Sequence, residues 1–95
     1  MTVTVKRVER ELDIPRDELI KEGIRTYLEF ELRSLKAEMS KILSRYNVHS
    51  FNELWDKLEK GEVSESECFE DLTKLEHLET RTEKVEALLK EHISS

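Results

Sequence analysis

The side chains of this chain that could do chemistry begin with a lone cysteine. Nucleophilic catalysis would need Cys68 or a serine beside a general base that a third group orients. Cys68 is the single cysteine, and it stands among Glu65, Glu67 and Glu70, whose charges oppose formation of a thiolate. We therefore expect Cys68 to be a packing residue.

Histidines are the other candidates, as metal ligands or as general bases. His49, His77 and His92 are isolated, and none forms the His-x3-His or Glu-x2-His spacing that builds a metal site on one helix face. The two glycines, Gly23 and Gly61, are too far apart for a phosphate-binding loop. The sequence thus predicts no metal, no cofactor and no enzymatic activity.

The composition indicates an all-α protein. The chain has 95 residues, enough for one domain, with 40% charged residues, 37% hydrophobic residues, two glycines and one proline. No apolar run approaches the roughly 18 residues of a membrane span, and the first ten residues lack the apolar core of a signal peptide. With its single cysteine, the chain is expected in the cytoplasm and away from membranes.

The charge is unevenly distributed. Residues 1–47 carry ten Lys and Arg against nine Asp and Glu, whereas residues 48–95 carry six against thirteen. An acidic C-terminal half repels nucleic acid and favours basic partners. The alternative interpretation is that both halves are simply solvated helix faces.

Residues 1–13 are expected to form an N-terminal arm. Thr2 to Lys6 alternates polar and β-branched apolar residues, which predicts a short strand, followed by a helical or irregular piece to Asp13. The arm also fits a helix, because Val5, Val8 and Leu12 are spaced three and four residues apart.

A long helix is predicted from Pro15, which suits the first helical position, to about Tyr46. At 32 residues it would be about 48 Å long and would overhang a compact globule about 32 Å across. Either the chain forms a long hairpin, or a second copy covers the apolar stripe; we favour a homodimer. The stripe repeats every seven residues and supplies the expected dimerisation residues Leu28, Leu32, Leu35, Met39, Ile42 and Tyr46.

Residues 50–95 are expected to form an acidic helical segment. Capping boxes at Ser50–Glu53 and Ser64–Glu67 predict helices over residues 51–60 and 65–90, the second continuing across a wholly polar run from Glu79 to Lys84. Its apolar residues could fill the core or occupy a groove on a partner. The expected partner-binding residues are Phe51, Leu54, Trp55, Leu58, Phe69, Leu72 and Leu75.

The segment Ile14–Glu29 resembles the second helix of ribbon-helix-helix antitoxins, in which an R-x-E-L-I-x-E-A-I-x-x-Y-L run follows a strand and a first helix. The chain departs from that pattern because Gly23 replaces an alanine and only seven residues are available for the first helix. In that family a dimer inserts paired strands into DNA. The resemblance thus implies a DNA-contacting set formed by Thr2, Thr4, Lys6 and Arg7.

Residues 46–72 are similar to small archaeal and bacterial proteins of antitoxin type. In VapB- and RelB-like pairs, an acidic helical tail wraps a basic nuclease. The favoured hypothesis is therefore a non-catalytic, antitoxin-like homodimer that binds a basic protein, such as a nuclease toxin. The alternatives are a DNA-binding regulator of ribbon-helix-helix type and a purely structural helical homodimer.

Overall fold

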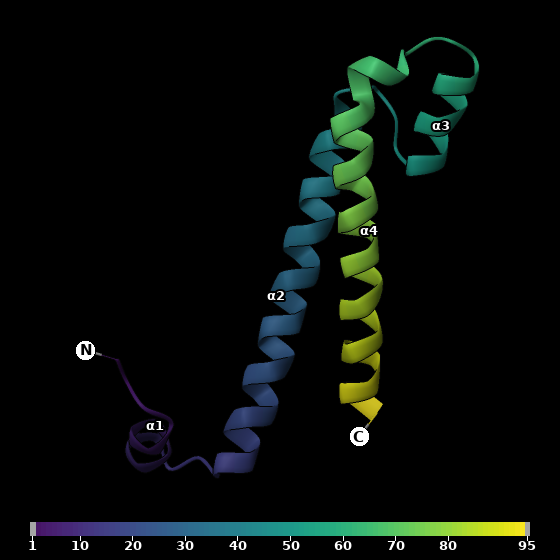
Figure 1. Cartoon of the computed structure of the whole chain (residues 1–95). Coiled ribbons are helices and arrows are strands. Elements are labelled where there is room, and N and C mark those ends of the chain that lie inside the picture. Colours follow the sequence, from purple (N-terminus) through teal and green to yellow (C-terminus); the bar gives the residue numbers. More distant parts are fainter. Residues whose placement is uncertain (1, 95) are drawn as a thin grey trace.

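The computed structural model describes residues 2–94 as an all-α chain, with the bounds α1 Val5–Leu12, α2 Arg16–Ser44, α3 Phe51–Glu59 and α4 Glu65–Ser94. The two long helices, α2 and α4, run antiparallel as a hairpin, and α3 lies in the connection between them (Figure 1). The fold class predicted from the sequence is confirmed.

Ion pairs between the two long helices mark their register. Lys74 lies 3.2 Å from Glu38, and Arg81 Nε donates to Glu31 Oε1 at 3.2 Å. The hydrogen bond from Arg81 lowers the pKa of the Glu31 carboxyl below its usual value. The step of seven residues from Lys74 to Arg81 along α4 is therefore matched by a step of seven backward along α2, as an antiparallel pair requires.

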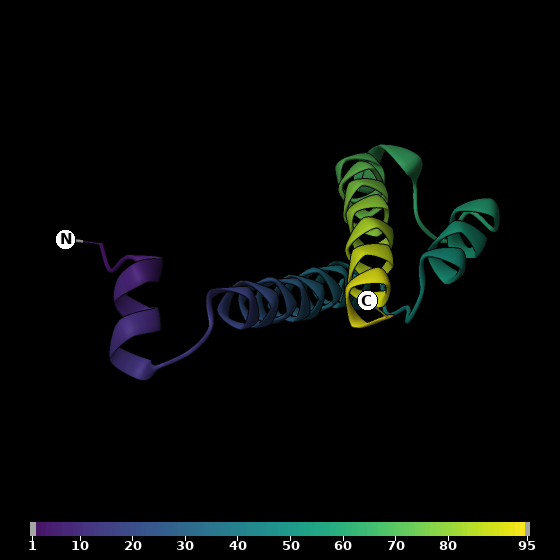
Figure 2. The same cartoon turned by 90° about the horizontal axis from the view of Figure 1, so that it is seen from below.

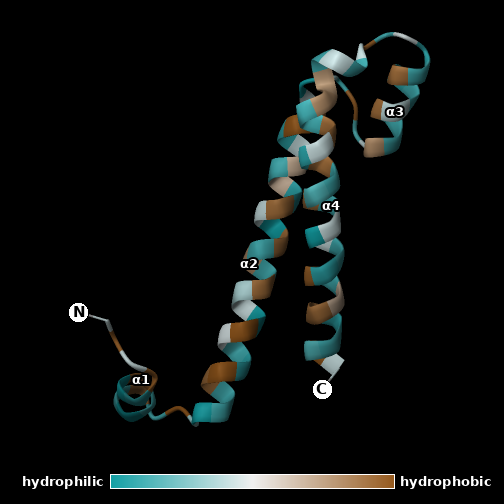
Figure 3. Ribbon diagram, in the orientation of Figure 1, coloured by the Kyte–Doolittle hydropathy of each residue, from teal (hydrophilic) through white to brown (hydrophobic). Residues whose placement is uncertain are grey.

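The core lies between α2 and α4 and extends under α3. Figure 3 shows hydrophobic segments recurring along both long helices. The buried apolar residues are Leu28, Leu35, Ile42, Leu43, Val48, Leu54, Cys68, Leu72, Leu75, Leu78 and Val85.

This core corrects the expected dimerisation surface. Leu28, Leu35 and Ile42 are only 7%, 5% and 2% exposed, while Leu32, Met39 and Tyr46 are half-buried against the same core. The stripe of α2 is thus covered by α4 of the same chain, so the hairpin alternative is the one realised. A dimer stays a prediction, but this stripe is not the surface that would form it.

The polar run Glu79–Lys84 does not break α4. Thr82 is buried, and its hydroxyl donates to the carbonyl oxygen of Leu78 at 2.7 Å. On the same turn of α4, Arg81 forms an ion pair with Glu31 of α2. The expectation of one continuous helix is confirmed, and the helix runs to Ser94 rather than fraying after Lys90.

The ends of the helices follow the expected signals with small shifts. Pro15 is the N-cap of α2 rather than its first residue, and α2 ends at Ser44, two residues before Tyr46. Ser50 accepts from the Glu53 amide at 3.2 Å, but the Glu53 carboxylate accepts from the amide of His49 rather than from that of Ser50. Gly61, with φ +75°, follows α3 in the left-handed conformation that favours glycine.

The predicted N-terminal strand is wrong. Thr4 is the N-cap of α1 and accepts from the Arg7 amide at 3.2 Å, so helix begins at Val5. Residues 2–94 contain no strand. A single strand needs a neighbouring strand for its hydrogen bonds, whereas a helix satisfies its own. The helical spacing of the apolar residues and the cap formed by Thr4 therefore favour the helix over the strand that the alternating pattern predicts.

The molecule is elongated, measuring 61 × 33 × 17 Å. Its radius of gyration is 19.2 Å, whereas a compact chain of this length has about 12 Å. Figures 1 and 2 show α1 beside the start of α2 and away from α3 and α4. The hairpin therefore has a closed end that carries α3 and an open end that carries α1.

Candidate binding surfaces

A polar network fastens the connection at the closed end. The Tyr46 hydroxyl donates to one carboxylate oxygen of Asp71, and Arg45 donates to the other at 3.2 Å. Lys57 of α3 donates to the carbonyl oxygen of Tyr46 at 2.8 Å. Burial and the neighbouring Asp71 charge raise the pKa of Tyr46 to about 12. These contacts hold α3 against the junction of α2 and α4.

A cleft of about 370 Å³ opens beside this junction. That volume is at the lower end of the range for ligand pockets, and it suits one or two large side chains of a partner. Its polar rim includes Lys36, His49 and Glu79. Its apolar lining consists of Met39, Leu43, Val48, Phe51 and Leu75.

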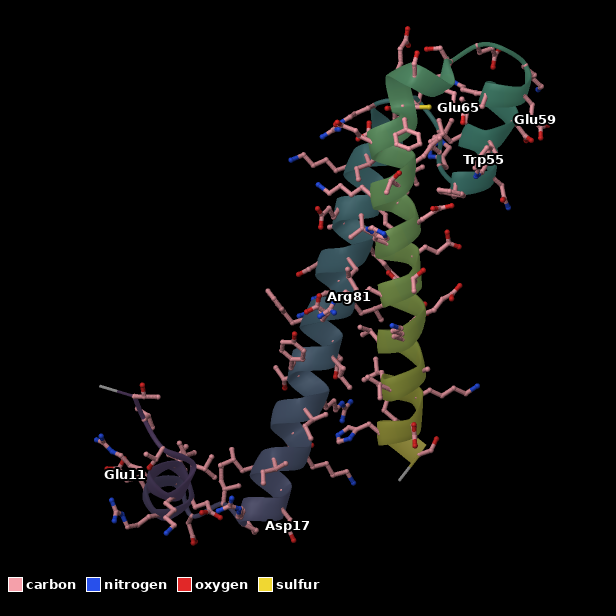
Figure 4. The ribbon with its side chains drawn as sticks, viewed as in Figure 1. Glu11, Asp17, Trp55, Glu59, Glu65 and Arg81 are labelled. Atoms are coloured by element: carbon pink, nitrogen blue, oxygen red, sulfur yellow. The ribbon has the colours of Figure 1, made fainter. Side chains whose placement is uncertain are left out.

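The net charge of the chain is located at the closed end. Residues 48–71, which we call the acidic end, contain eight Asp and Glu against two Lys, a balance equal to the −6 of the whole chain. Outside this segment the chain has fourteen acidic and fourteen basic residues. Seven of the eight acidic side chains are exposed, among them those of Glu59 on α3 and Glu65 at the start of α4, both labelled in Figure 4. Only Asp71 is half-buried.

The seven expected partner-binding residues divide into two groups. Leu54, Leu72 and Leu75 are buried in the core, at 0%, 7% and 1% exposure, so they cannot contact a partner in this conformation. Phe51 and Leu58 pack against the core in half-buried positions. Core residues and partner-contacting residues recur at the same helical spacing, so the sequence alone could not distinguish them.

Two aromatic residues at the acidic end remain accessible. Trp55 on α3 is 40% exposed, and Phe69 on α4 is 61% exposed (Figure 4 labels Trp55). The Trp55 and Phe51 rings form a T-shaped contact, with centroids 6.0 Å apart and planes inclined by 68°. Such a contact orients the indole while leaving part of it free.

The expected DNA-contacting residues do not form a ribbon. Thr2, Thr4, Lys6 and Arg7 are all exposed, but Thr4 caps α1 and Arg7 pairs with Glu11 at 3.1 Å. A strand that presents alternate side chains to a groove is absent from this part of the described chain. These four residues therefore lack the strand through which ribbon-helix-helix proteins contact DNA bases.

The chemically reactive side chains are dispersed. Cys68 is fully buried, its thiol donates to the Ser64 carbonyl oxygen at 3.3 Å, and burial raises its pKa. His49 and His77 are exposed, and His92 lies at the open end with Nε2 2.8 Å from the Lys21 carbonyl oxygen. Within residues 2–94, no three His, Cys, Asp or Glu side chains are grouped as metal ligands would be.

A second surface, at the open end, was not anticipated from the sequence. Tyr27 and Phe30 are 56% and 59% exposed and lie off the stripe that packs on α4. With Leu19 and Gly23 they line a shallow groove on the outer side of α2. The signal that could have revealed it is the presence of apolar residues on two sides of the same helix.

None of the helices within the described residues has the length and apolarity needed to cross a membrane.

Comparison with known proteins identifies a family for this chain. A protein of Methanocaldococcus jannaschii, described as "Uncharacterized protein MJ0235", is 39% identical to this chain over 61 residues, which cover 64% of this chain and 74% of that protein. No solved structure shows significant similarity to the chain. The family model described as "Uncharacterized protein MJ0235 family" matches residues 1–93, and the chain therefore belongs to that family.

Proposed function

We propose that this chain is a non-catalytic binding protein that uses its acidic end to bind a basic protein. The observation that supports the proposal most strongly is the location of the charge: residues 48–71 hold the equivalent of the entire net charge, on a helical cap that also exposes Trp55. Charge of one sign on a small surface speeds and orients the encounter with a partner of opposite sign.

Trp55 and Phe69 are the residues best suited to supply binding energy at this end. Interface hot spots are enriched in tryptophan, and large exposed aromatic side chains have apolar surface to lose on binding. Both are accessible without any rearrangement of the hairpin. The acidic side chains around them would steer the partner, and the two rings would hold it.

The resemblance to antitoxins indicates which basic partner to examine first. In such pairs the acidic helical protein covers a basic nuclease, and this chain has the same division between a neutral N-terminal region and an acidic cap. A small basic nuclease of the same organism is therefore the partner that this proposal names.

Affinity capture with matched bait variants tests the proposal. Wild-type bait is expected to recover one small basic protein in near-stoichiometric amount from an extract of the source cells. Trp55→Ala combined with Phe69→Ala should reduce that recovery at least tenfold. The matched control, Tyr27→Ala combined with Phe30→Ala, also removes two exposed aromatics but should keep the partner. Recovery by the first variant equal to that of wild type would contradict the proposal.

A further inference from the structure

The open end of the hairpin carries most of the exposed apolar surface. We define it as α1, residues 16–30 of α2 and residues 84–94 of α4. Of the eleven large apolar side chains exposed in residues 2–94, nine belong to this end or to the chain just before α1, and two belong to the acidic end. The nine are Val3, Val5, Leu12, Ile20, Ile24, Tyr27, Phe30, Leu88 and Ile93.

The first half of α2 is apolar on two opposite sides. Ile20 and Ile24 continue the stripe that faces α4. Phe30 lies two residues beyond the buried Leu28, which is about 200° around an α-helix. A helix that is apolar on more than one side is normally enclosed by neighbours on both sides, yet α4 covers only one of them.

Helix α1 also has an apolar face that the rest of the chain does not bury. Its apolar residues Val5, Val8 and Leu12 fall on one face, but α1 buries none of its residues. A helix of eight residues is marginal in water by itself, even when it is capped at both ends as α1 is by Thr4 and Asp13. A lasting α1 therefore requires an apolar surface against which to pack.

From these features we propose that a second copy of this chain packs against the first at the open end. Each copy would place the Val5–Leu12 face of α1 and the Leu19–Phe30 side of α2 against the same elements of the other copy. One surface supplies both halves of such an isologous contact, so it needs no other protein.

The apolar area of the proposed contact fits a protein interface. Its large exposed side chains are Val5, Leu12, Tyr27 and Phe30, at 43%, 66%, 56% and 59% exposure. Together they present roughly 400 Å² of apolar side-chain surface in each copy, about the apolar share of the 800 Å² that one partner buries in a standard interface.

The charges also favour a second copy over a charged partner. Outside residues 48–71 the chain has no net charge, and charged groups of the open end already pair along their own helices, Arg7 with Glu11 and Arg25 with Glu29. Two copies that meet at their open ends place their acidic ends far apart along molecules 61 Å long. Contact through the acidic ends would instead bring together two segments that each carry a net charge of −6, and these segments would repel each other.

Sedimentation velocity over a hundredfold range of protein concentration tests this inference. The wild-type chain is expected to sediment as a species with twice the 11.3 kDa mass of one copy. Leu12→Glu and Phe30→Glu should each weaken the dimer at least tenfold, because each would place a carboxylate in an apolar contact. Both side chains are exposed in the single chain, at 66% and 59%, so neither change should unfold the hairpin.

The matched control is Phe69→Glu, the same kind of substitution at a side chain of similar exposure, 61%, at the other end of the molecule. Its dimer should be unchanged. A wild-type chain that remains monomeric at every concentration would overturn the inference. So would a dimer that Phe69→Glu disperses and Phe30→Glu does not. Neither result depends on the partner proposed for the acidic end.

Discussion

At the scale of single residues, burial decides what each side chain can do. Cys68 and Tyr46 both carry ionisable groups, and both are held in neutral form by their surroundings: burial raises the pKa of the Cys68 thiol, and burial together with Asp71 raises that of the Tyr46 phenol. Trp55 and Phe69, only a turn or less from buried neighbours, remain open to a partner. Successive residues of a helix project in directions about 100° apart, so one residue can lie in the core while its neighbour is exposed.

Tyr46 gives a prediction at this scale. Because its pKa is raised to about 12 in the folded chain, the phenol should stabilise the fold up to about pH 10 and lose that contribution as the pH rises toward 12. An ultraviolet titration of the folded protein should show a tyrosine that ionises with a midpoint near 12. That step should vanish in Tyr46→Phe and persist in Tyr27→Phe. Its persistence in Tyr46→Phe would contradict the Tyr46–Asp71 contact.

At the scale of elements, the two long helices explain why part of the fold could be predicted from the sequence and part could not. The heptad from Leu28 and the cap residues Ser50 and Ser64 are local signals, and they located α2, α3 and α4 to within a few residues. Which helix covers the heptad is not a local property. A stripe packed on α4 and a stripe packed on a second copy have the same periodicity.

In the candidate site too, the burial of individual residues depends on how the helices pack and could not be predicted from the sequence. The acidic segment and its aromatic residues could be identified from sequence, but the burial of Leu54, Leu72 and Leu75 follows from how α3 and α4 fold back on α2. In residues 2–6 the alternation of valine and threonine indicated a strand, and the helical alternative prevailed because Thr4 caps α1. Tyr27 and Phe30 were missed because they lie off the main stripe.

A pair of truncations in α4 tests which face of this helix is buried. Leu75 is 1% exposed and faces the core, so Leu75→Ala should lower the free energy of unfolding by about 2–5 kcal/mol. Phe69→Ala removes a larger side chain from the same helix, but at 61% exposure it should cost less than about 1 kcal/mol. Urea denaturation followed by circular dichroism measures both. Equal costs would mean that α4 is turned differently about its axis.

At the scale of the whole molecule, the hairpin separates two kinds of surface. One end is acidic and carries α3 with its exposed aromatic residue; the other is neutral and apolar and carries α1. The paired helices α2 and α4 separate the two ends, and their ion pairs and core run along the length between them. Under the two proposals made above, the basic partner and the second copy would bind at opposite ends of the molecule and would not compete.

We propose that the charge of the acidic end drives partner binding, and a calorimetric titration measures its contribution. The basic protein recovered by the wild-type chain would be titrated by calorimetry against wild type and against a variant with Glu62→Gln, Glu65→Gln, Glu67→Gln and Glu70→Gln, at low and at high salt. We predict that wild-type affinity falls steeply with salt, and that the variant binds at least tenfold more weakly at low salt with a much shallower salt dependence. Equal affinities and equal salt dependence for the two proteins would contradict the claim.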